Sequence, residues 1–193
     1  MRFVGLRKSQ RPEGASSVAS PLDMGESLVG AYLRYGEECD FVVYGTQTEG
    51  QGEIDVIGFQ VDQRRVWLCE VATHLDGISY GSAGMVGTLT KVRQKVQRAV
   101  AFGDRMFPGQ EKRFEWWSPK AGPTLSAHFP AICDELTTKE TEVAFVVNAE
   151  YADRVAVLFK QAKKGTKATP EPFFRSLQIL AHLAGSPMRW DHD

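Results

Sequence analysis

Hydrophobic residues recur along the chain with two spacings, one typical of amphipathic helices and the other of strands. The helical spacing predicts helices over residues 22–35, 88–106, 150–163 and 173–183. Short runs rich in β-branched and aromatic residues predict strands at 39–45, 53–61, 65–73, 113–117 and 143–148. Part of the segment 123–140 is expected to be helical. The order of these elements predicts an α/β fold with a mixed β-sheet flanked by helices.

Polar and glycine-containing segments separate the predicted elements. Residues 46–52 are expected to form a turn, and residues 62–64 have the length and polarity of a hairpin connection between two strands. Residues 77–87 contain repeated glycines and predict a flexible loop. Residues 1–20 show little periodicity, so we expect a mobile arm ahead of a single domain over 21–193.

The composition is that of an ordinary globular protein and excludes two broad classes. Of the 193 residues, 42% are hydrophobic and 24% are charged, which is unlike a disordered or fibrous chain. Lys and Arg number 23 and Asp and Glu 24, giving a net charge of -1. A whole-protein field therefore does not attract nucleic acid or anionic membrane, and any site for a polyanion has to be local.

Cysteine usage and hydropathy indicate the compartment. Cys39, Cys69 and Cys133 are far apart and odd in number, so we expect free, buried thiols and no disulfide framework or zinc site. The N-terminal segment has no continuous apolar stretch, and nowhere is there an apolar run long enough for a membrane span. We expect a cytoplasmic protein that is neither secreted nor membrane-bound.

Three carboxylates stand at positions where a polar residue is costly. Glu26 lies roughly 40° from the centre of the apolar stripe of the first predicted helix, at about 100° per residue, so it should point toward the sheet. Asp55 interrupts the apolar run GEIDVIGF, and Glu70 interrupts VWLCEVAT. A buried carboxylate needs a partner.

The strands that carry Asp55 and Glu70 are predicted neighbours, so the two acids are expected to lie close together. Two unpaired anions at short distance repel each other unless a cation lies between them. Two carboxylates, the Val71 carbonyl and water form a hard oxygen ligand set, which suits Mg²⁺ or Mn²⁺ better than zinc. Taken singly, each acid is also compatible with a solvated face or an ion pair.

At these residues the chain resembles the PD-(D/E)XK nuclease superfamily, which has the restriction-endonuclease-like fold. In that pattern a helix bearing Glu precedes strands that bear Asp and then acid-x-Lys. Glu26 in GESLVGAYL, Asp55 in GEIDVIGF and Glu70 in LCEVATHL match these positions. The resemblance covers residues 22–106. It implies an αβββαβ core, here with extra C-terminal helices, and a metal-dependent nuclease site.

The chain departs from the pattern at Ala72, where the family usually has a lysine. That lysine orients the attacking water and stabilises charge on the phosphate. Lys95, at the border of the apolar face of the 88–106 helix, is the first candidate for a relocated lysine, and Lys91 is the second. Both are also compatible with a solvated helix flank, and the site with a degenerate one that does not cut.

Further residues are candidates for contacts with nucleic acid. Lys91, Gln94 and Arg98 share the flank of one predicted helix and are placed to contact backbone phosphates. His74 follows Glu70 by four residues and is a candidate for proton transfer or phosphate binding. Trp116 and Trp117 are candidates for stacking on bases, although adjacent strand residues face opposite sides and one of them should be core.

These observations predict a metal-dependent nuclease with Asp55, Glu70 and Val71 as metal ligands and Glu26 completing the acidic cluster. Lys95 would replace the missing lysine, Mg²⁺ or Mn²⁺ would be the cofactor, and nucleic acid, expected to be DNA, would be the partner. The alternative is a nuclease-fold module that binds nucleic acid or a protein without cutting. The apolar residues of 173–183 suit either the core or a homodimer seam.

Overall fold

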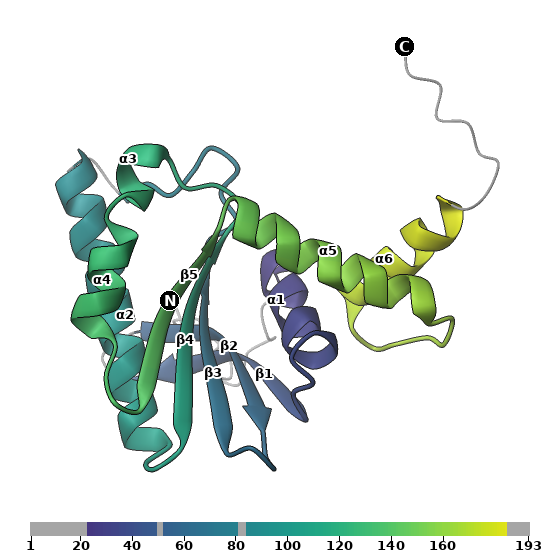
Figure 1. The fold of residues 1–193 in the computed structure, drawn as a ribbon, viewed down its shortest axis with the longest axis horizontal. Coiled ribbons are helices and arrows are strands. Elements are labelled where there is room, and N and C mark those ends of the chain that lie inside the picture. The colour runs from purple at the N-terminus through teal and green to yellow at the C-terminus, as the bar shows by residue number, and fades with distance from the viewer. Residues whose placement is uncertain (1–22, 50–51, 81–83, 185–193) are drawn as a thin grey trace, which may run out of the picture.

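A five-stranded mixed sheet lies between two groups of helices, as the sequence predicts (Figure 1). The computed structural model describes residues 23–49, 52–80 and 84–184. The elements in chain order are α1 (Met24–Tyr35), β1 (Phe41–Thr48), β2 (Gly52–Gln60), β3 (Arg65–Val71), α2 (Gly84–Met106), β4 (Glu111–Ser118), α3 (Pro123–Ser126), α4 (Phe129–Leu136), β5 (Thr141–Val147), α5 (Ala149–Lys164) and α6 (Pro172–Leu183). The arm predicted at 1–20 lies outside the described residues.

The sheet follows the order of the chain, from β1 at one edge to β5 at the other. β1, β2 and β3 are antiparallel, whereas β3, β4 and β5 are parallel. The predicted hairpin is confirmed, with Phe59 opposite Val66 and Val56 opposite Cys69. Because parallel strands end at the same edge of a sheet, the carboxyl ends of β3, β4 and β5 lie together at the top of Figure 1.

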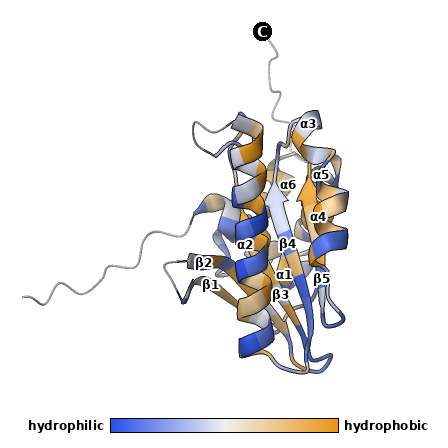
Figure 2. Ribbon diagram, turned by 90° about the vertical axis from the view of Figure 1, so that its left-hand side faces the viewer, coloured by the Kyte–Doolittle hydropathy of each residue, from blue (hydrophilic) through white to orange (hydrophobic). Residues whose placement is uncertain are grey.

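Each face of the sheet is covered by helices and has its own hydrophobic core. On one face α2 and α4 pack against a cluster that contains Leu68, Phe114 and Trp116. On the other, α1, α5 and α6 pack against a cluster that contains Trp67 and Trp117. Figure 2 shows α2 lying lengthwise against the sheet, with polar and apolar residues alternating along it. This alternation is what an amphipathic covering helix requires.

Trp116 and Trp117 are both core residues, which corrects the expectation that one of them stacks on bases. Both indoles are 0% exposed and they lie on opposite faces of β4. The reason is that helices cover both faces of this central strand, so neither face has access to solvent or to a nucleic-acid base.

Two element boundaries differ by more than two residues from those predicted. β1 continues through much of the segment predicted as a turn, because pairing with β2 resumes after Gly45 and runs to Thr48 opposite Gly52. Gly45 has φ +61°, a conformation that glycine adopts without steric cost. Helix α2 begins at Gly84, four residues before the predicted start at Thr88, despite the low helix propensity of glycine.

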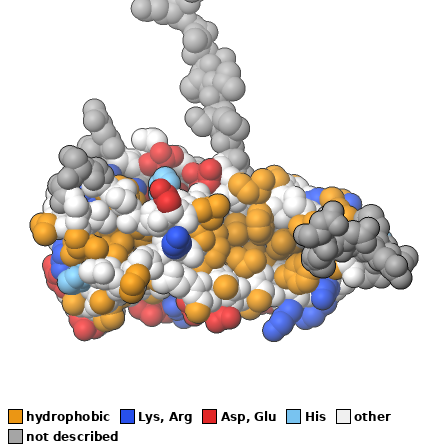
Figure 3. All heavy atoms as spheres, turned by 90° about the horizontal axis from the view of Figure 1, so that it is seen from above, with side chains coloured by type: hydrophobic (Ala, Val, Ile, Leu, Met, Phe, Trp, Pro, Cys, Tyr) orange, Lys and Arg blue, Asp and Glu red, His pale blue; other side chains and the backbone are white. Residues whose placement is uncertain are grey.

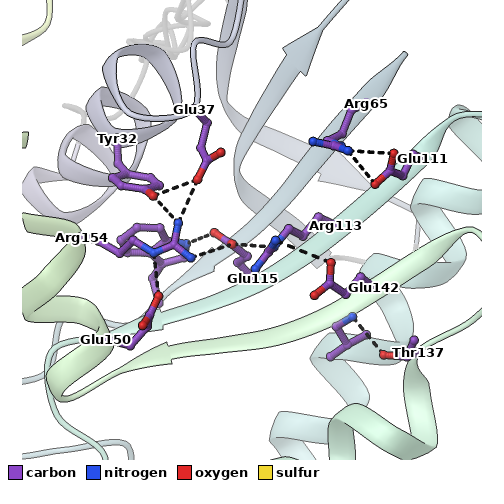
Figure 4. A network of polar contacts seen from close by, with 12 residues as sticks. Tyr32, Glu37, Arg65, Glu111, Arg113, Glu115, Thr137, Glu142, Glu150 and Arg154 are labelled. Carbon is purple, nitrogen blue, oxygen red and sulfur yellow. Dashed lines mark hydrogen bonds and ion pairs between the residues drawn. The ribbon is translucent and has the colours of Figure 1, made fainter. Parts of the chain in front are cut away.

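A buried charge network holds α1 and α5 onto the sheet (Figure 4). Glu115, in the centre of β4, has a side chain that is 0% exposed and lies 2.9 Å from Arg113 and 3.9 Å from Arg154. Its Oε2 also accepts a 2.9 Å hydrogen bond from the Trp117 indole N–H. Arg154 on α5 also forms an ion pair with Glu37, which lies just after α1, at 2.9 Å. The pKa of Glu115 is raised by burial, an effect that the two arginines oppose.

The three cysteines are free thiols in the described structure. Cys39 and Cys69 are buried, and Cys133 is half-buried. No described helix is both long enough and apolar enough to cross a membrane.

Candidate active site

Asp55 and Glu70 occupy the open end of the β2–β3 hairpin. The last registered pair of the two strands is Val56 opposite Cys69, and each acid lies one residue beyond it. This end of the hairpin is also where the parallel strands β3 and β4 finish. The structure therefore brings these two acids to the same end of the sheet, as predicted.

A side chain replaces the next backbone bond of the ladder. Oδ2 of Asp55 accepts a 2.6 Å hydrogen bond from the backbone N–H of Val71, the residue after Glu70. Burial raises the pKa of the Asp55 carboxyl, while the Val71 N–H and Lys95 act in the opposite direction and Glu53 and Asp23 raise it further. The acid is held in place by one donor and has further acceptor capacity.

Glu70 is buried, and its partner is the lysine predicted to substitute for the missing one. Oε1 of Glu70 is in direct contact with Nζ of Lys95, which reaches down from α2. Ala72, where the PD-(D/E)XK pattern has lysine, is 5% exposed and packs in the core on the α2 side. The cation of this site thus comes from the helix and not from the strand.

Two aromatic rings flank the Lys95 ammonium group. Its Nζ lies 5.7 Å from the centroid of Tyr80 and 5.6 Å from that of Trp116. Such positions stabilise a cation over the ring face. Burial lowers the pKa of Lys95, and Asp55 opposes this effect. The backbone N–H of Tyr80 donates a 3.1 Å hydrogen bond to Oγ1 of Thr88, which ties the loop after β3 to α2.

Helix α1 adds a third acid from the opposite side of the sheet. Its N-cap, Asp23, accepts a 2.8 Å hydrogen bond from the backbone N–H of Gly25. A Cβ on Gly25 would lie 2.1 Å from Cγ2 of Thr73, so glycine permits the close approach of α1 to the end of β3. Burial, Asp55, Asp23 and Glu53 together raise the pKa of Glu26 to about 6.

The other predicted site residues make no hydrogen bond or ion pair with Asp55, Glu70 or Lys95 in the described part of the chain. Lys91 and Gln94 are exposed on α2, and His74 is exposed just after β3. Arg98 is half-buried and packs on β2, where a Cβ on Gly52 would lie 2.2 Å from its Nη1. Their roles toward nucleic acid stay predictions.

The side chains present suit a hard divalent cation better than a soft one. The potential ligands are carboxylates, which favour Mg²⁺ or Mn²⁺. Burial is the main cause of the raised pKa values of Glu26 and Asp55, and neighbouring acids raise both pKa values further. Within residues 23–49, 52–80 and 84–184, no three His, Cys, Asp or Glu side chains converge as a ready-made metal cluster. The predicted ligand set has only two carboxylates, with a backbone carbonyl and water completing it.

The surface above this end of the sheet combines charge with exposed apolar groups. Figure 3 shows acidic side chains, with histidine and basic groups among them, in the left-hand half of this face, beside a band of hydrophobic side chains. Leu75 in the loop after β3 and Val86 in the first turn of α2 are 78% and 77% exposed. Exposed apolar side chains therefore lie in the loop after β3 and at the start of α2.

Two residues of the site were not identified from the sequence. Asp23 carries no signal beyond its place before an amphipathic helix, which is the N-cap signature. Tyr80 lies in a glycine-containing loop, and its backbone hydrogen bond to Thr88 holds it beside Lys95.

Comparisons of the chain with protein-family models, with curated proteins and with solved structures found no match.

Proposed function

We propose that this protein is a metal-dependent nuclease with a restriction-endonuclease-like core that hydrolyses phosphodiester bonds, with DNA as the expected substrate. The observation that carries the proposal is the meeting of Asp55, Glu70 and Lys95 at the open end of one hairpin. The order α1, β1–β3, α2, β4 also agrees with the core that the resemblance implies. These residues supply the two charges that phosphoryl chemistry needs, anionic metal ligands and a cation for the phosphate.

Asp55 and Glu70 would hold Mg²⁺ or Mn²⁺ through their free carboxylate oxygens, with the Val71 carbonyl as a further ligand. A cation bound there supplies a water of lowered pKa and neutralises negative charge on the phosphate. Asp55 is kept in position by the Val71 N–H, and Lys95 by the rings of Tyr80 and Trp116.

Lys95 and Glu26 have distinct tasks in this proposal. The Lys95 ammonium group donates hydrogen bonds to a non-bridging phosphate oxygen and so stabilises the charge that grows during attack. The Glu26 carboxyl, with its pKa raised to about 6, exchanges protons close to neutral pH, as a group that assists proton transfer must. Lys91, Gln94, Arg98 and His74 contact the nucleic-acid backbone.

A second candidate function is a module of the same fold that binds nucleic acid or a protein without cutting. The contact between Lys95 and Glu70 favours it, because this pair already neutralises the buried carboxylate without a metal ion. The two functions differ in their response to metal, since binding alone does not require the Asp55 carboxylate.

The deciding experiment incubates the purified chain with supercoiled plasmid, linear duplex DNA, single-stranded DNA and RNA. Each substrate is tested with Mg²⁺, with Mn²⁺ and with EDTA. The nuclease proposal predicts products only in the two metal-containing reactions, and loss of products in Asp55→Asn. Retained binding without products in any metal would instead support the non-cutting module.

A further inference from the structure

Two neighbouring cavities lie where α5 and α6 meet, far along the chain from the acidic site. Their volumes are about 560 and 540 Å³. Both values fall within the range of about 300–1,000 Å³ that small-molecule sites occupy. The cavities share Gly165, Thr166 and Gln178, so the turn between the two helices separates them.

Both cavities have basic side chains in their lining. Five basic or imidazole side chains contribute to it, namely Lys163, Arg175 and His182 in the first cavity and Lys164 and Lys167 in the second. No Asp or Glu lines either cavity in the described part of the chain. Basic side chains gather at the same end of the molecule in Figure 3. Lysines and arginines that converge without acids attract anions.

These basic groups, of which Arg175 is half-buried and the other four are exposed, differ in their pairing from the buried or half-buried cations at the sheet. Lys112, Arg113 and Arg154 each have carboxylate partners at 2.9 Å. Within the described residues, none of the five groups that line the cavities makes an ion pair. No described carboxylate therefore competes with a ligand for these groups, and the Lys163 ammonium group lies 4.9 Å from the centroid of the Phe159 ring.

A buried glutamine fixes the geometry of the first cavity. Nε2 of Gln178 donates 3.1 Å hydrogen bonds to the backbone carbonyls of Gly165 and Lys167 in the turn. Its Oε1 accepts a 3.1 Å hydrogen bond from Nη1 of Arg175. Gln178 thus holds the turn against α6 and orients the guanidinium group before any ligand arrives.

Apolar groups line the same cavities beside the charges. Ala162, Ile179 and Leu183 contribute to the first, and the stacked rings of Tyr35 and Phe174, with centroids 3.9 Å apart, contribute to the second. A ligand that matches both features carries an anionic group and an apolar or aromatic body.

We propose that the α5–α6 junction binds a phosphorylated organic molecule of about mononucleotide size. Lys163 and Arg175 bind the phosphate, and Ile179 and Leu183 pack against the organic part. This inference is independent of the proposed nuclease function.

The test is isothermal titration of the full-length chain with adenosine 5′-monophosphate and, separately, with inorganic phosphate, both in EDTA. We expect saturable binding of the nucleotide, weakened about tenfold or more in Lys163→Gln and in Arg175→Gln, since each variant loses a charged hydrogen bond. Lys160→Gln, also on α5 but not lining either cavity, is the matched control and should bind as the parent does. Because Lys163 is exposed, its variant keeps the test valid if Arg175→Gln fails to fold.

Three outcomes would overturn the proposal. The first is no saturable binding of the nucleotide, and the second is an equal loss in Lys160→Gln. The third is a single-stranded oligonucleotide that binds through Lys163 and Arg175 when the mononucleotide does not, which would make the region a nucleic-acid contact. Equal affinity for phosphate and nucleotide would identify free phosphate as the source of the anion. The same titration of Asp55→Asn should be unchanged, which separates this site from the acidic one.

Discussion

The backbone N–H of Val71 donates its hydrogen bond to the side chain of Asp55, 2.6 Å away, at the point where β2 and β3 stop pairing through their backbones. One donor therefore serves two purposes. It ends the ladder without leaving a polar group unsatisfied, and it holds a carboxylate beside Glu70. The arrangement fixes an acid at a position where burial alone opposes its charge.

Replacing Asp55 should separate these structural and chemical roles. Asp55→Asn keeps an acceptor for the Val71 N–H, so its free energy of unfolding should stay within about 1 kcal/mol of the parent. Asp55→Ala leaves that N–H without its partner and should cost about 1–3 kcal/mol. Urea unfolding in EDTA measures both values. Equal stability of the two variants would show that the hydrogen bond contributes nothing.

The raised pKa of Glu26 predicts a pH-dependent loss of stability. Because the pKa is about 6 in the folded chain against a usual value of 4.5, the folded state binds the proton more tightly. Stability from this group is full below pH 4.5 and falls as the pH rises through 6. Solvent screening of a half-buried group limits the loss to less than about 1 kcal/mol.

Glu26→Gln removes the titrating group and should flatten this part of the profile. Thermal unfolding in EDTA at several values between pH 4.5 and 7 compares the variant with the parent. A slope that is identical in the two proteins would assign the pH dependence to other carboxyls, Asp55 first among them.

The exchange of Ala72 and Lys95 tests whether the lysine has moved from strand to helix. Ala72→Lys alone should be less stable by about 1–3 kcal/mol, because position 72 is buried and already filled, and it should not raise turnover. In a Lys95→Met background the same change returns a cation to the face of Glu70 and should recover part of the activity. Cleavage by Ala72→Lys when the parent shows none would favour the non-cutting module.

Glu115 provides a prediction about the scaffold on the other face. Its carboxylate is buried between Arg113 and Arg154, so Glu115→Gln removes the one carboxylate that both arginines share and should cost about 2 kcal/mol of unfolding free energy. Arg113 keeps Glu142, and Arg154 keeps Glu37 and Glu150. Turnover of the folded fraction should be unchanged, because Glu115 contacts Arg113, Arg154 and Trp117 and none of the proposed site residues. A variant of normal stability but reduced turnover would contradict this division between scaffold and site.

Glu70 and Glu115 are both buried acids in central strands, but they have different partners. Glu70 interrupts an apolar strand, and the sequence predicts that it is costly there. Glu115 shares its strand face with Arg113, and nothing in the sequence indicates that it is buried. The sequence does not show that Glu115 meets two arginines while Glu70 meets one lysine, because these partners come from elements distant along the chain. The burial of Glu70 is thus predictable from the pattern, whereas the burial of Glu115 and the distinction between scaffold and site require the fold.

Other parts of the site differ in the same way. The periodicity of α2 places Lys95 at the border of its apolar face, so its direction was predictable. The position of Tyr80 was not, because it depends on a loop whose only marked contact is with Thr88. The end of β1 was misjudged because polar Thr46–Thr48 lies in an edge strand, where exposed alternating positions carry little hydrophobic signal.

Replacement of Lys95 should reduce turnover while changing binding little. Lys95→Met retains the apolar stem between the rings of Tyr80 and Trp116 but lacks the charge. A cation that acts on the transition state is worth about 10²-fold or more in rate. Lys91→Met, one turn away and exposed, is the matched control. If both variants lose activity equally and only through weaker binding, α2 is a docking face and not a source of the catalytic cation.

The rate of nucleic-acid cleavage in Mn²⁺ and in EDTA, measured for the parent and for Asp55→Asn at saturating substrate, tests the central claim most directly. The account predicts products from the parent in Mn²⁺, none in EDTA, and at least about 10²-fold slower cleavage by the variant, whose fold is retained. Equal rates in Mn²⁺ and EDTA, or full activity of Asp55→Asn, would contradict the claim that Asp55 and Glu70 form a metal-dependent hydrolytic site.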